Sequence, residues 1–295
     1  MAFAAKNKKW LGYGLYVVLV TFFLLYYLFP TQAVEEFVDN SVSRMNPGLG
    51  FKAKRIGPWI PAGLRINGGT IYLKDPTAAE VFKADSVYIG PRILKLARGE
   101  YSIDLSGTAY SGNIRGIFHA GDKNGAILQS ELSFKDFELA QYGFPAEILK
   151  HSVTGKLSGD IVYGKDPANA EGSGKAELRL SGGRLQFQAP IFGIGSVDLQ
   201  NIDMALELRN REITIVKAEM AGSEVKGSLT GSIQLQPDMK LSQLNLKGTL
   251  EPLAEFYKNY PEIRELLKSM RKRVRRGQYS FAITGTLGEP RFRLL

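Results

Sequence analysis

The chain has 295 residues, contains no cysteine and carries a formal net charge of +9. The missing cysteine excludes a disulfide framework and a thiolate metal site. The positive charge lies in two places, at Lys6, Lys8 and Lys9 and in a run from Lys268 to Arg276, and the rest of the chain is neutral overall. Because the excess positive charge is confined to two short segments, it does not indicate a nucleic-acid-binding surface.

Residues 11–29 form an apolar run without a charged side chain. At a rise of 1.5 Å per residue, this run is just long enough to cross the hydrocarbon core of a bilayer as one helix. Because lysines precede it, we expect a cytoplasmic stub over residues 1–9, a single transmembrane helix over residues 10–29, and the following chain on the far side of the membrane.

A cleaved signal peptide is the alternative explanation of this run. The residues Thr31-Gln32-Ala33 are its best cleavage site, although they match the usual small-residue pattern only weakly. The apolar core of a signal is usually about 7–15 residues, and this run is longer and rich in Tyr and Phe. Trp10 at one end and Tyr26 and Tyr27 at the other fit aromatic belts at two membrane interfaces. The length and the aromatic residues favour an uncleaved anchor.

Residues 30–46 are expected to form a short amphipathic helix and linker. Apolar residues recur at helical spacing, and Asn46-Pro47-Gly48 ends the pattern. The predicted apolar stripe carries Val34, Phe37, Val38, Val42 and Met45, and Glu35, Glu36, Asp39 and Arg44 face away from it. Such a helix either caps the following domain or lies on the membrane surface.

Residues 47–295 are expected to form one β-rich domain. Apolar and polar residues alternate over many short stretches, which predicts a mainly β fold: a large, curved antiparallel sheet of about fourteen strands, arranged as a groove or a sandwich. Glycine and asparagine clusters, among them Asn67-Gly68-Gly69, Ser181-Gly182-Gly183 and Arg209-Asn210-Arg211, predict turns. The candidate apolar face comprises Leu178, Leu180, Leu185, Phe187, Ile202, Met204, Leu206, Leu208, Val225, Leu229, Ile233, Phe281 and Ile283.

Glycines recur within this pattern. A G-x-L-x-G-x-I theme covers residues 155–161 and 227–233 and returns in part at residues 283–287. Glycines at alternate positions lie on the apolar face, where they thin the sheet and permit bends or bulges. The sequence leaves two alternatives open: the face is a packed core, or it is a trough that holds acyl chains.

Residues 251–276 are predicted to interrupt the strands with a helical segment, because apolar residues recur there at helical spacing and Gly277 follows. The basic run at its end is explained by a solvated helix end or by contact with an anionic surface, either lipid headgroups or an acidic partner. The candidate contact residues are Lys268, Arg271, Lys272, Arg273, Arg275 and Arg276.

The sequence contains no recognisable catalytic constellation. His119 and His151 have no neighbouring metal-ligand spacing, and no nucleophile elbow, Walker loop or zinc-protease motif is present. We therefore expect a protein that is not an enzyme, with no catalytic residue, no metal and no cofactor.

Several stretches, which together extend over nearly the whole chain, carry a resemblance to known families. The predicted anchor, the helix predicted after it, the block Gly57–Phe118 and the closing FAITGTLGEPRFRL at Phe281–Leu294 are together similar to the inner-membrane form of type II secretion system protein N. The pattern A-D-S-V-x-I-G at Ala84–Gly90 and G-T-L-x-x-P-x-F-x-L at Gly285–Leu294 also resemble the AsmA-like superfamily of periplasmic β-groove proteins.

The resemblance implies a single-pass protein of the inner membrane of a Gram-negative bacterium, with its main domain in the periplasm and no catalytic residues. It implies a non-enzymatic component of type II protein secretion that contacts other secretion subunits. The alternative is an AsmA-like module that binds or transfers phospholipid. AsmA-like members are often much longer, so independent bridging of the periplasm is not expected of this chain.

Overall fold

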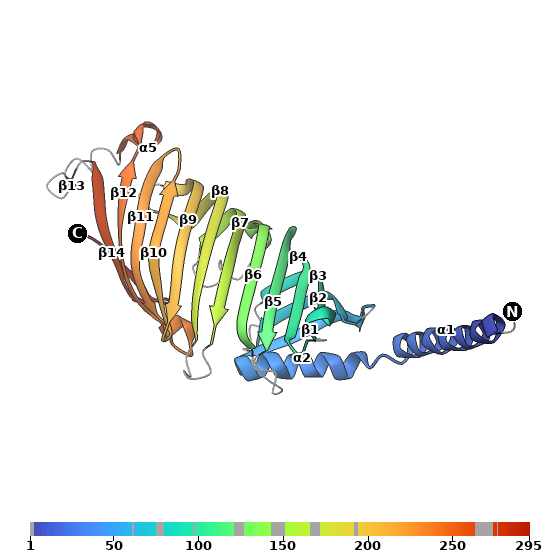
Figure 1. Ribbon diagram of the computed structural model, residues 1–295. Coiled ribbons are helices and arrows are strands. Elements are labelled where there is room, and N and C mark those ends of the chain that lie inside the picture. The colour runs from blue at the N-terminus through green and yellow to red at the C-terminus, as the bar shows by residue number, and fades with distance from the viewer. Residues whose placement is uncertain are drawn as a thin grey trace. The chain divides into compact units, whose positions relative to one another are not determined.

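The computed structural model describes residues 3–60, 62–74, 80–96, 98–120, 127–142, 151–165, 172–191, 194–262, 274–275 and 277–295. The chain divides into two compact units, Met1–Pro91 and Arg92–Leu295. Figure 1 shows the elements of both units. The division falls inside the predicted β-rich domain of residues 47–295.

The first unit combines helices with a small antiparallel sheet in which β2 pairs with both β1 and β3. Its elements are α1 (Phe3–Tyr27), α2 (Thr31–Met45), β1 (Leu49–Pro58), β2 (Leu64–Leu73) and β3 (Glu80–Pro91).

Helix α1 contains most of the predicted membrane span. Its described large side chains, such as Trp10, Leu15 and Phe23, are mainly exposed. Over the described residues, no helix reaches both the length and the mean hydropathy required of a membrane-crossing segment. The side chains of Leu11 and Leu25, which belong to the predicted span, lie outside the described residues. Residues 10–27 are thus helical, and their role as a transmembrane span stays a prediction.

Helix α2 covers the outer edge of β1 with carboxylates. The backbone N–H of Phe51 donates to Asp39 Oδ1 at 2.6 Å, and the N–H of Ala53 donates to Glu35 Oε1 at 2.9 Å. An edge strand presents unpaired backbone groups that invite pairing with another chain. Here two of those donors are bound by side chains of the same molecule.

Hydroxyl groups of α2 bind carbonyls of the same strand. Thr31 Oγ1 donates to the carbonyl of Ile56 at 3.3 Å, and Ser43 Oγ donates to the carbonyl of Leu49 at 3.1 Å. Together with the two carboxylates, these side chains recur at every fourth position, which places them along one side of the helix. The helix thus holds β1 along most of its length.

The predicted apolar stripe of this helix is not the side that contacts β1. Phe37, in that stripe, is 69% exposed, which is compatible with the alternative in which the helix lies on a membrane surface. Glu35 and Asp39, predicted to face away from the stripe, are half-buried against β1. Apolar periodicity predicts apolar contact only, whereas α2 contacts the strand edge through polar groups that match the backbone donors and acceptors.

Loss of both carboxylates is expected to destabilise the edge. In a Glu35→Ala/Asp39→Ala protein, two backbone N–H groups lose their acceptors, at a cost of about 1–2 kcal/mol each. We expect a lower denaturation midpoint and more self-association of the full chain in detergent. Glu36→Ala, a change of an exposed carboxylate on the same helix, is the control. Equal behaviour of the two proteins would contradict the role given to Glu35 and Asp39.

The second unit is an extended antiparallel sheet with short helical turns. Its strands are β4 (Tyr101–Ala109), β5 (Gly112–Ala120), β6 (Ile127–Glu138), β7 (His151–Gly164), β8 (Ser173–Ile191), β9 (Ile194–Arg209), β10 (Glu212–Ala221), β11 (Val225–Gln234), β12 (Gln243–Pro252), β13 (Val274–Arg275), β14 (Gln278–Thr286) and β15 (Pro290–Leu294). The helical pieces are α3 (Ile93–Leu96), η1 (Leu139–Gln141), η2 (Met239–Leu241) and α5 (Ala254–Asn259).

Strands β4 to β12 lie side by side in chain order and are followed by β14, which pairs with both β13 and β15. Figure 1 shows these strands as one curved layer. Within the described residues of this unit, the strands form no second sheet. The predicted mainly β fold and curved antiparallel sheet are therefore confirmed, and the described strands do not form the alternative sandwich.

Two of the predicted turns are bends inside strands. Gly68 lies within β2 and Gly182 within β8, each with a φ of +61°. A glycine in this conformation bends a strand without ending it, so glycine pairs alone do not separate a bulge from a turn. The third prediction is confirmed, because Asn210 and Arg211 form the tight turn between β9 and β10 with φ values of 50° and 59°.

The predicted helical segment over residues 251–276 is correct only in part. Helix α5 covers Ala254–Asn259, whereas Val274–Arg275 is the short strand β13. Residues 263–273 and 276 lie outside the described residues, and so do Lys268, Arg271, Lys272, Arg273 and Arg276 of the basic run and the side chain of Arg275. The predicted helix was expected to continue to residue 276. Instead, residues 274–275 pair as a strand with Gln278–Tyr279.

Candidate functional site

One face of the second unit is apolar from strand to strand. Directly paired residues of antiparallel strands point to the same face, so the register identifies its members. One row of paired residues from β6 to β12 and β14 comprises Phe134, Gly159, Leu178, Met204, Ala218, Leu229, Gly248 and Phe281. A neighbouring row comprises Leu132, Ile161, Ala176, Leu206, Ile215, Gly231, Leu246 and Ile283. We call the side that carries both rows the apolar face.

The register places residues that were predicted for this face near one another. Six predicted residues belong to the two rows, and Leu180 and Ile202 pair with each other directly beside the rows. Leu208 and Ile233 both pair with Ile213, one further step along the strands. The described predicted members outside the two rows are Leu180, Leu185, Ile202, Leu208, Val225 and Ile233. The side chain of Phe187 lies outside the described residues.

Leu185 reaches the apolar face because of the bend at Gly182. In a regular strand, Leu180 and Leu185 lie on opposite faces, since they are five positions apart. Leu185 pairs with Val197, and Val197 packs against the buried Val225 cluster. The positive φ of Gly182 therefore keeps both halves of β8 apolar on the same side.

One buried cluster of the face was not predicted from the sequence. Ile215, Leu244 and Leu246 are 8%, 8% and 6% exposed and form a cluster with Ala218. The register shifts between Ile215 and Ala218 on β10, so residues three positions apart share a face. That bulge breaks the alternation of β10, whereas Leu244 and Leu246 follow a plain alternation that would have identified them.

Glycines lie under large side chains of neighbouring strands on this face. A Cβ atom on Gly159 would lie 2.6 Å from Leu178 Cδ2 and 3.0 Å from Phe134 Cζ. A Cβ atom on Gly248 would overlap Phe281 Cζ. The large side chains of Phe134, Leu178 and Phe281 therefore lie over glycine backbone, and at Gly159 this contact accounts for one glycine of the G-x-L-x-G-x-I theme.

Helix α5 closes one end of the apolar face. Phe256 is buried against Val225, with Val197 and Met220 beside it, and Figure 1 shows α5 at one end of β11 and β12. Burial raises the pKa of the Tyr260 hydroxyl, and the nearby carboxylates add to this effect.

The rings of Tyr110 and Phe137 meet edge to face near η1, with their centroids 5.9 Å apart, and burial raises the pKa of the neighbouring Tyr142. Aromatic side chains thus lie at separate places around the face.

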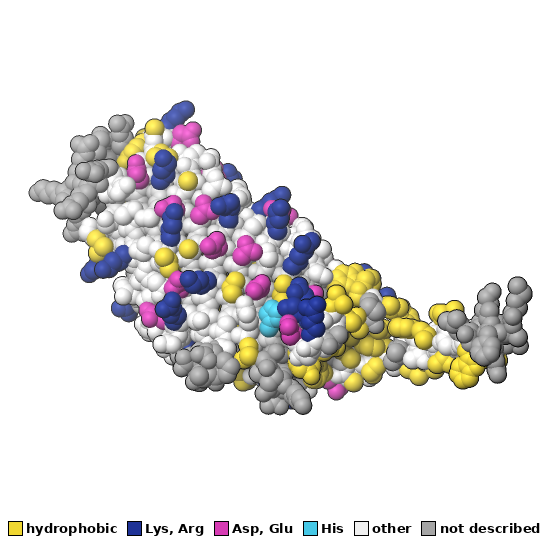
Figure 2. Space-filling view, in the orientation of Figure 1, with side chains coloured by type: hydrophobic (Ala, Val, Ile, Leu, Met, Phe, Trp, Pro, Cys, Tyr) yellow, Lys and Arg dark blue, Asp and Glu magenta, His cyan; other side chains and the backbone are white. Residues whose placement is uncertain are grey.

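The other face of the sheet is polar. Figure 2 shows charged side chains of both signs dispersed over it, with few apolar ones. Basic residues of β8 lie directly opposite acidic residues of β9. The ion pairs are Lys175–Glu207 at 3.1 Å, Arg179–Asp203 at 2.6 Å and Arg184–Asp198 at 2.7 Å. Hydrogen bonding to these carboxylates raises the pKa of both Arg179 and Arg184.

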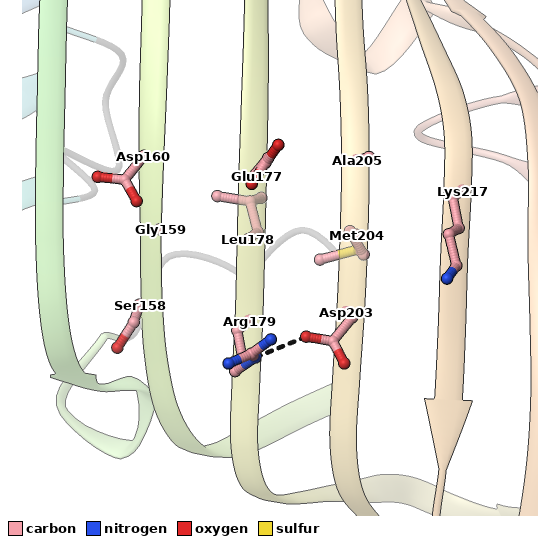
Figure 3. A pocket seen from close by; sticks show the side chains of 10 residues that line it. All are labelled: Ser158, Gly159, Asp160, Glu177, Leu178, Arg179, Asp203, Met204, Ala205 and Lys217. Carbon is pink, nitrogen blue, oxygen red and sulfur yellow. Dashed lines mark hydrogen bonds and ion pairs between the residues drawn. The ribbon is translucent and has the colours of Figure 1, made fainter.

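A depression of about 510 Å³ lies on this polar face, over β7 to β10. Figure 3 shows Arg179 directed at Asp203, while Asp160 and Glu177 extend from adjacent strands. Lys217, which also lines the depression, pairs with Glu219 at 2.9 Å. Arg179 and Lys217 in the depression are already paired with carboxylates, so the depression has no unpaired cation among these two to bind an anionic ligand.

Within the described residues, no cluster of side chains is arranged as a metal-binding site. No group of three or more His, Cys, Asp and Glu side chains in this part of the chain is placed to hold a metal ion. His119 Nδ1 lies 2.9 Å from Ser102 Oγ, and the side chain of His151 is outside the described residues. The expectation that the protein is not an enzyme stays a prediction.

Comparisons of the chain with protein-family models, curated proteins and solved structures give no match. The resemblance to secretion and AsmA-like proteins therefore has no independent support. What it implies about secretion and lipid handling stands as a proposal.

A methyl group at Gly248 is expected to disturb the apolar face. In Gly248→Ala the new methyl meets the Phe281 ring and the carbonyl of Ser228 at 2.5 Å, and overpacking of this kind costs about 1–3 kcal/mol. Denaturant unfolding of the full chain measures this cost. Gly57→Ala, a strand glycine with nothing within 4 Å of its Cβ position, is the matched control. A loss no greater than that of the control would contradict the packing described.

Proposed function

We propose that this protein is a non-enzymatic, membrane-attached binding protein whose apolar face holds the acyl chains of a lipid. The supporting observation is a face apolar from β6 to β12 and β14 on a sheet that carries no second layer within the described residues. Large continuous apolar surfaces on proteins are typically binding sites. Each methylene placed on such a surface contributes about 0.8 kcal/mol, so ten methylenes contribute roughly 8 kcal/mol before the entropic cost of binding.

The proposal places α1 in an inner membrane, with residues 1–9 in the cytoplasm and the sheets in the periplasm. The charge-free run 11–29 and the lysines before it support this orientation. Trp10, Tyr26 and Tyr27 are exposed near the two ends of the apolar run, where membrane interfaces favour aromatic rings. A membrane at this position supplies the lipid that the apolar face would receive.

Photo-crosslinking tests the lipid site. A benzophenone amino acid in place of Leu229 is directed to the apolar face, and the same group in place of the adjacent Thr230 is directed to the polar face. The full chain is irradiated in bacterial membranes, purified in detergent and analysed by mass spectrometry. We expect phospholipid adducts at position 229 several-fold above those at position 230. Equal adducts, or none at position 229, would rule out the proposed site.

A charge on the face should displace the lipid. With the crosslinker at position 229, Leu206→Asp is expected to reduce adducts about tenfold, because a carboxylate is costly to cover with hydrocarbon. Thr214→Asp, on an exposed position of the next strand, is the matched control and is expected to leave the adducts unchanged. Circular dichroism of both proteins establishes that the sheet is retained.

A second candidate function is a role as a component of type II protein secretion that contacts other secretion subunits. An exposed aromatic and arginine cluster in the first unit favours it. The Arg65 guanidinium lies 5.2 Å from the Tyr88 ring and 5.9 Å from the Trp59 ring, and the two rings meet edge to face at 4.8 Å. Trp59 is 47% and Ile60 65% exposed. Trp, Tyr and Arg are the residues most enriched at energetic centres of protein interfaces.

Secretion by a deletion strain of the source bacterium tests this second function. We expect loss of exoprotein secretion on deletion, rescue by the wild-type chain, and poor rescue by Trp59→Ala/Arg65→Ala. Arg55→Ala, at an exposed position of β1, is the control and should rescue fully. Normal secretion in the deletion strain would exclude the role.

A further inference from the structure

The outer edge of β15 is open in the described structure. Strand β15 pairs with β14, with Ile283 opposite Phe292 and Phe281 opposite Leu294. The N–H of Leu295 donates to the carbonyl of Ser280 at 2.9 Å. Because bonded and non-bonded pairs alternate along an antiparallel ladder, the backbone N–H and C=O groups of Phe292 and Leu294 point away from β14.

This edge lacks the protection found at β1. There, side chains of α2 bind the outward backbone groups of the strand, among them the N–H of Phe51 and the N–H of Ala53. Within the described residues, no side chain binds the outward groups of Phe292 and Leu294. An unprotected edge of this kind is the structural requirement for addition of a further strand.

The side chains of β15 specify what such a strand would contain. Phe292 is 58% exposed and stacks on Phe281 at 5.2 Å, so it continues the apolar face. Arg291 and Arg293 point to the polar face and are exposed, and neither forms an ion pair with the described residues. Between β8 and β9, by contrast, each such arginine has a carboxylate directly opposite on the next strand. At β15, the described residues provide no such neighbouring strand.

We propose that β15 binds an extended segment of a partner protein by strand addition, and that this segment alternates apolar residues with Asp or Glu. Its apolar residues would lie beside Phe292 and Leu294. Its carboxylates would lie opposite Arg291 and Arg293 and complete the ion-pair pattern of the polar face. The proposal does not require lipid binding, because it is argued from the open backbone groups and the arginines of β15.

Peptide binding to the full chain in detergent tests the proposal. The probe is a fluorescent peptide of alternating Glu and Val, matched to β15 in length, and the comparison peptide has Lys in place of Glu. Fluorescence anisotropy is expected to show at least about tenfold tighter binding of the Glu peptide, with weaker binding at higher salt. Arg291→Glu/Arg293→Glu is expected to reverse the preference. Failure of the Glu peptide to bind, or equal binding of both peptides, would overturn the proposal.

A proline variant separates backbone pairing from side-chain contact. Phe292→Pro removes an outward N–H without removing a bond to β14, whereas Phe292→Ala removes only the side chain. We expect the proline variant to bind the Glu peptide about tenfold more weakly than the alanine variant, with the same denaturation midpoint. Equal binding by the two variants would overturn strand addition. Self-association of the wild-type chain that Phe292→Pro abolishes would identify a second copy as the occupant and overturn the proposed partner.

Discussion

The antiparallel backbone ladder is the constraint on which the second unit depends. In its described part, a single layer of strands has no second sheet to bury its apolar side, so each strand is held by its two neighbours and by side chains lying along the face. Interlocking of large residues with glycines follows from this arrangement. Phe281 lies over Gly248, and Phe134 and Leu178 lie over Gly159. The large side chains therefore cover the glycine backbone within one layer. The outer surface of these side chains is itself apolar, so the face as a whole stays apolar.

The two faces of this layer differ in what they leave unsatisfied. On the polar face, the basic residues of β8 are matched by acidic residues of β9, as in the Arg179–Asp203 pair, and the pair is complete without any ligand. On the apolar face, Ile215 and Leu246 are buried by neighbouring side chains, while Leu229 and Ile283 around them are only partly buried. Charge can be neutralised within one layer, but apolar surface can be removed from water only by a covering group. This difference is why the proposed lipid site lies on the apolar face.

The two outer strand edges, at β1 and β15, also differ in whether their outward backbone groups have hydrogen-bond partners among the described residues. At β1, the carboxylates of Glu35 and Asp39 bind outward N–H groups, so this edge is satisfied within the chain. At β15, the two arginines and the outward groups of Phe292 have no counterpart among the described residues. A carboxylate that accepts from backbone N–H groups excludes a further strand, whereas an open edge beside uncompensated cations favours an acidic one.

The sequence by itself determined the class of this fold, because alternation with a period of two specifies half-buried strands whatever their partners. It also identified part of the apolar face, including Leu178, Met204 and Leu229, and the glycine theme beneath it. The tertiary structure decided the rest. Alternation is local, so it did not show that Gly68 and Gly182 bend strands instead of ending them, or that the bulge on β10 returns Ala218 to the face of Ile215. Nor did it show that Glu35 and Asp39 face a strand edge, since their acceptor role depends on backbone groups brought beside them only by folding.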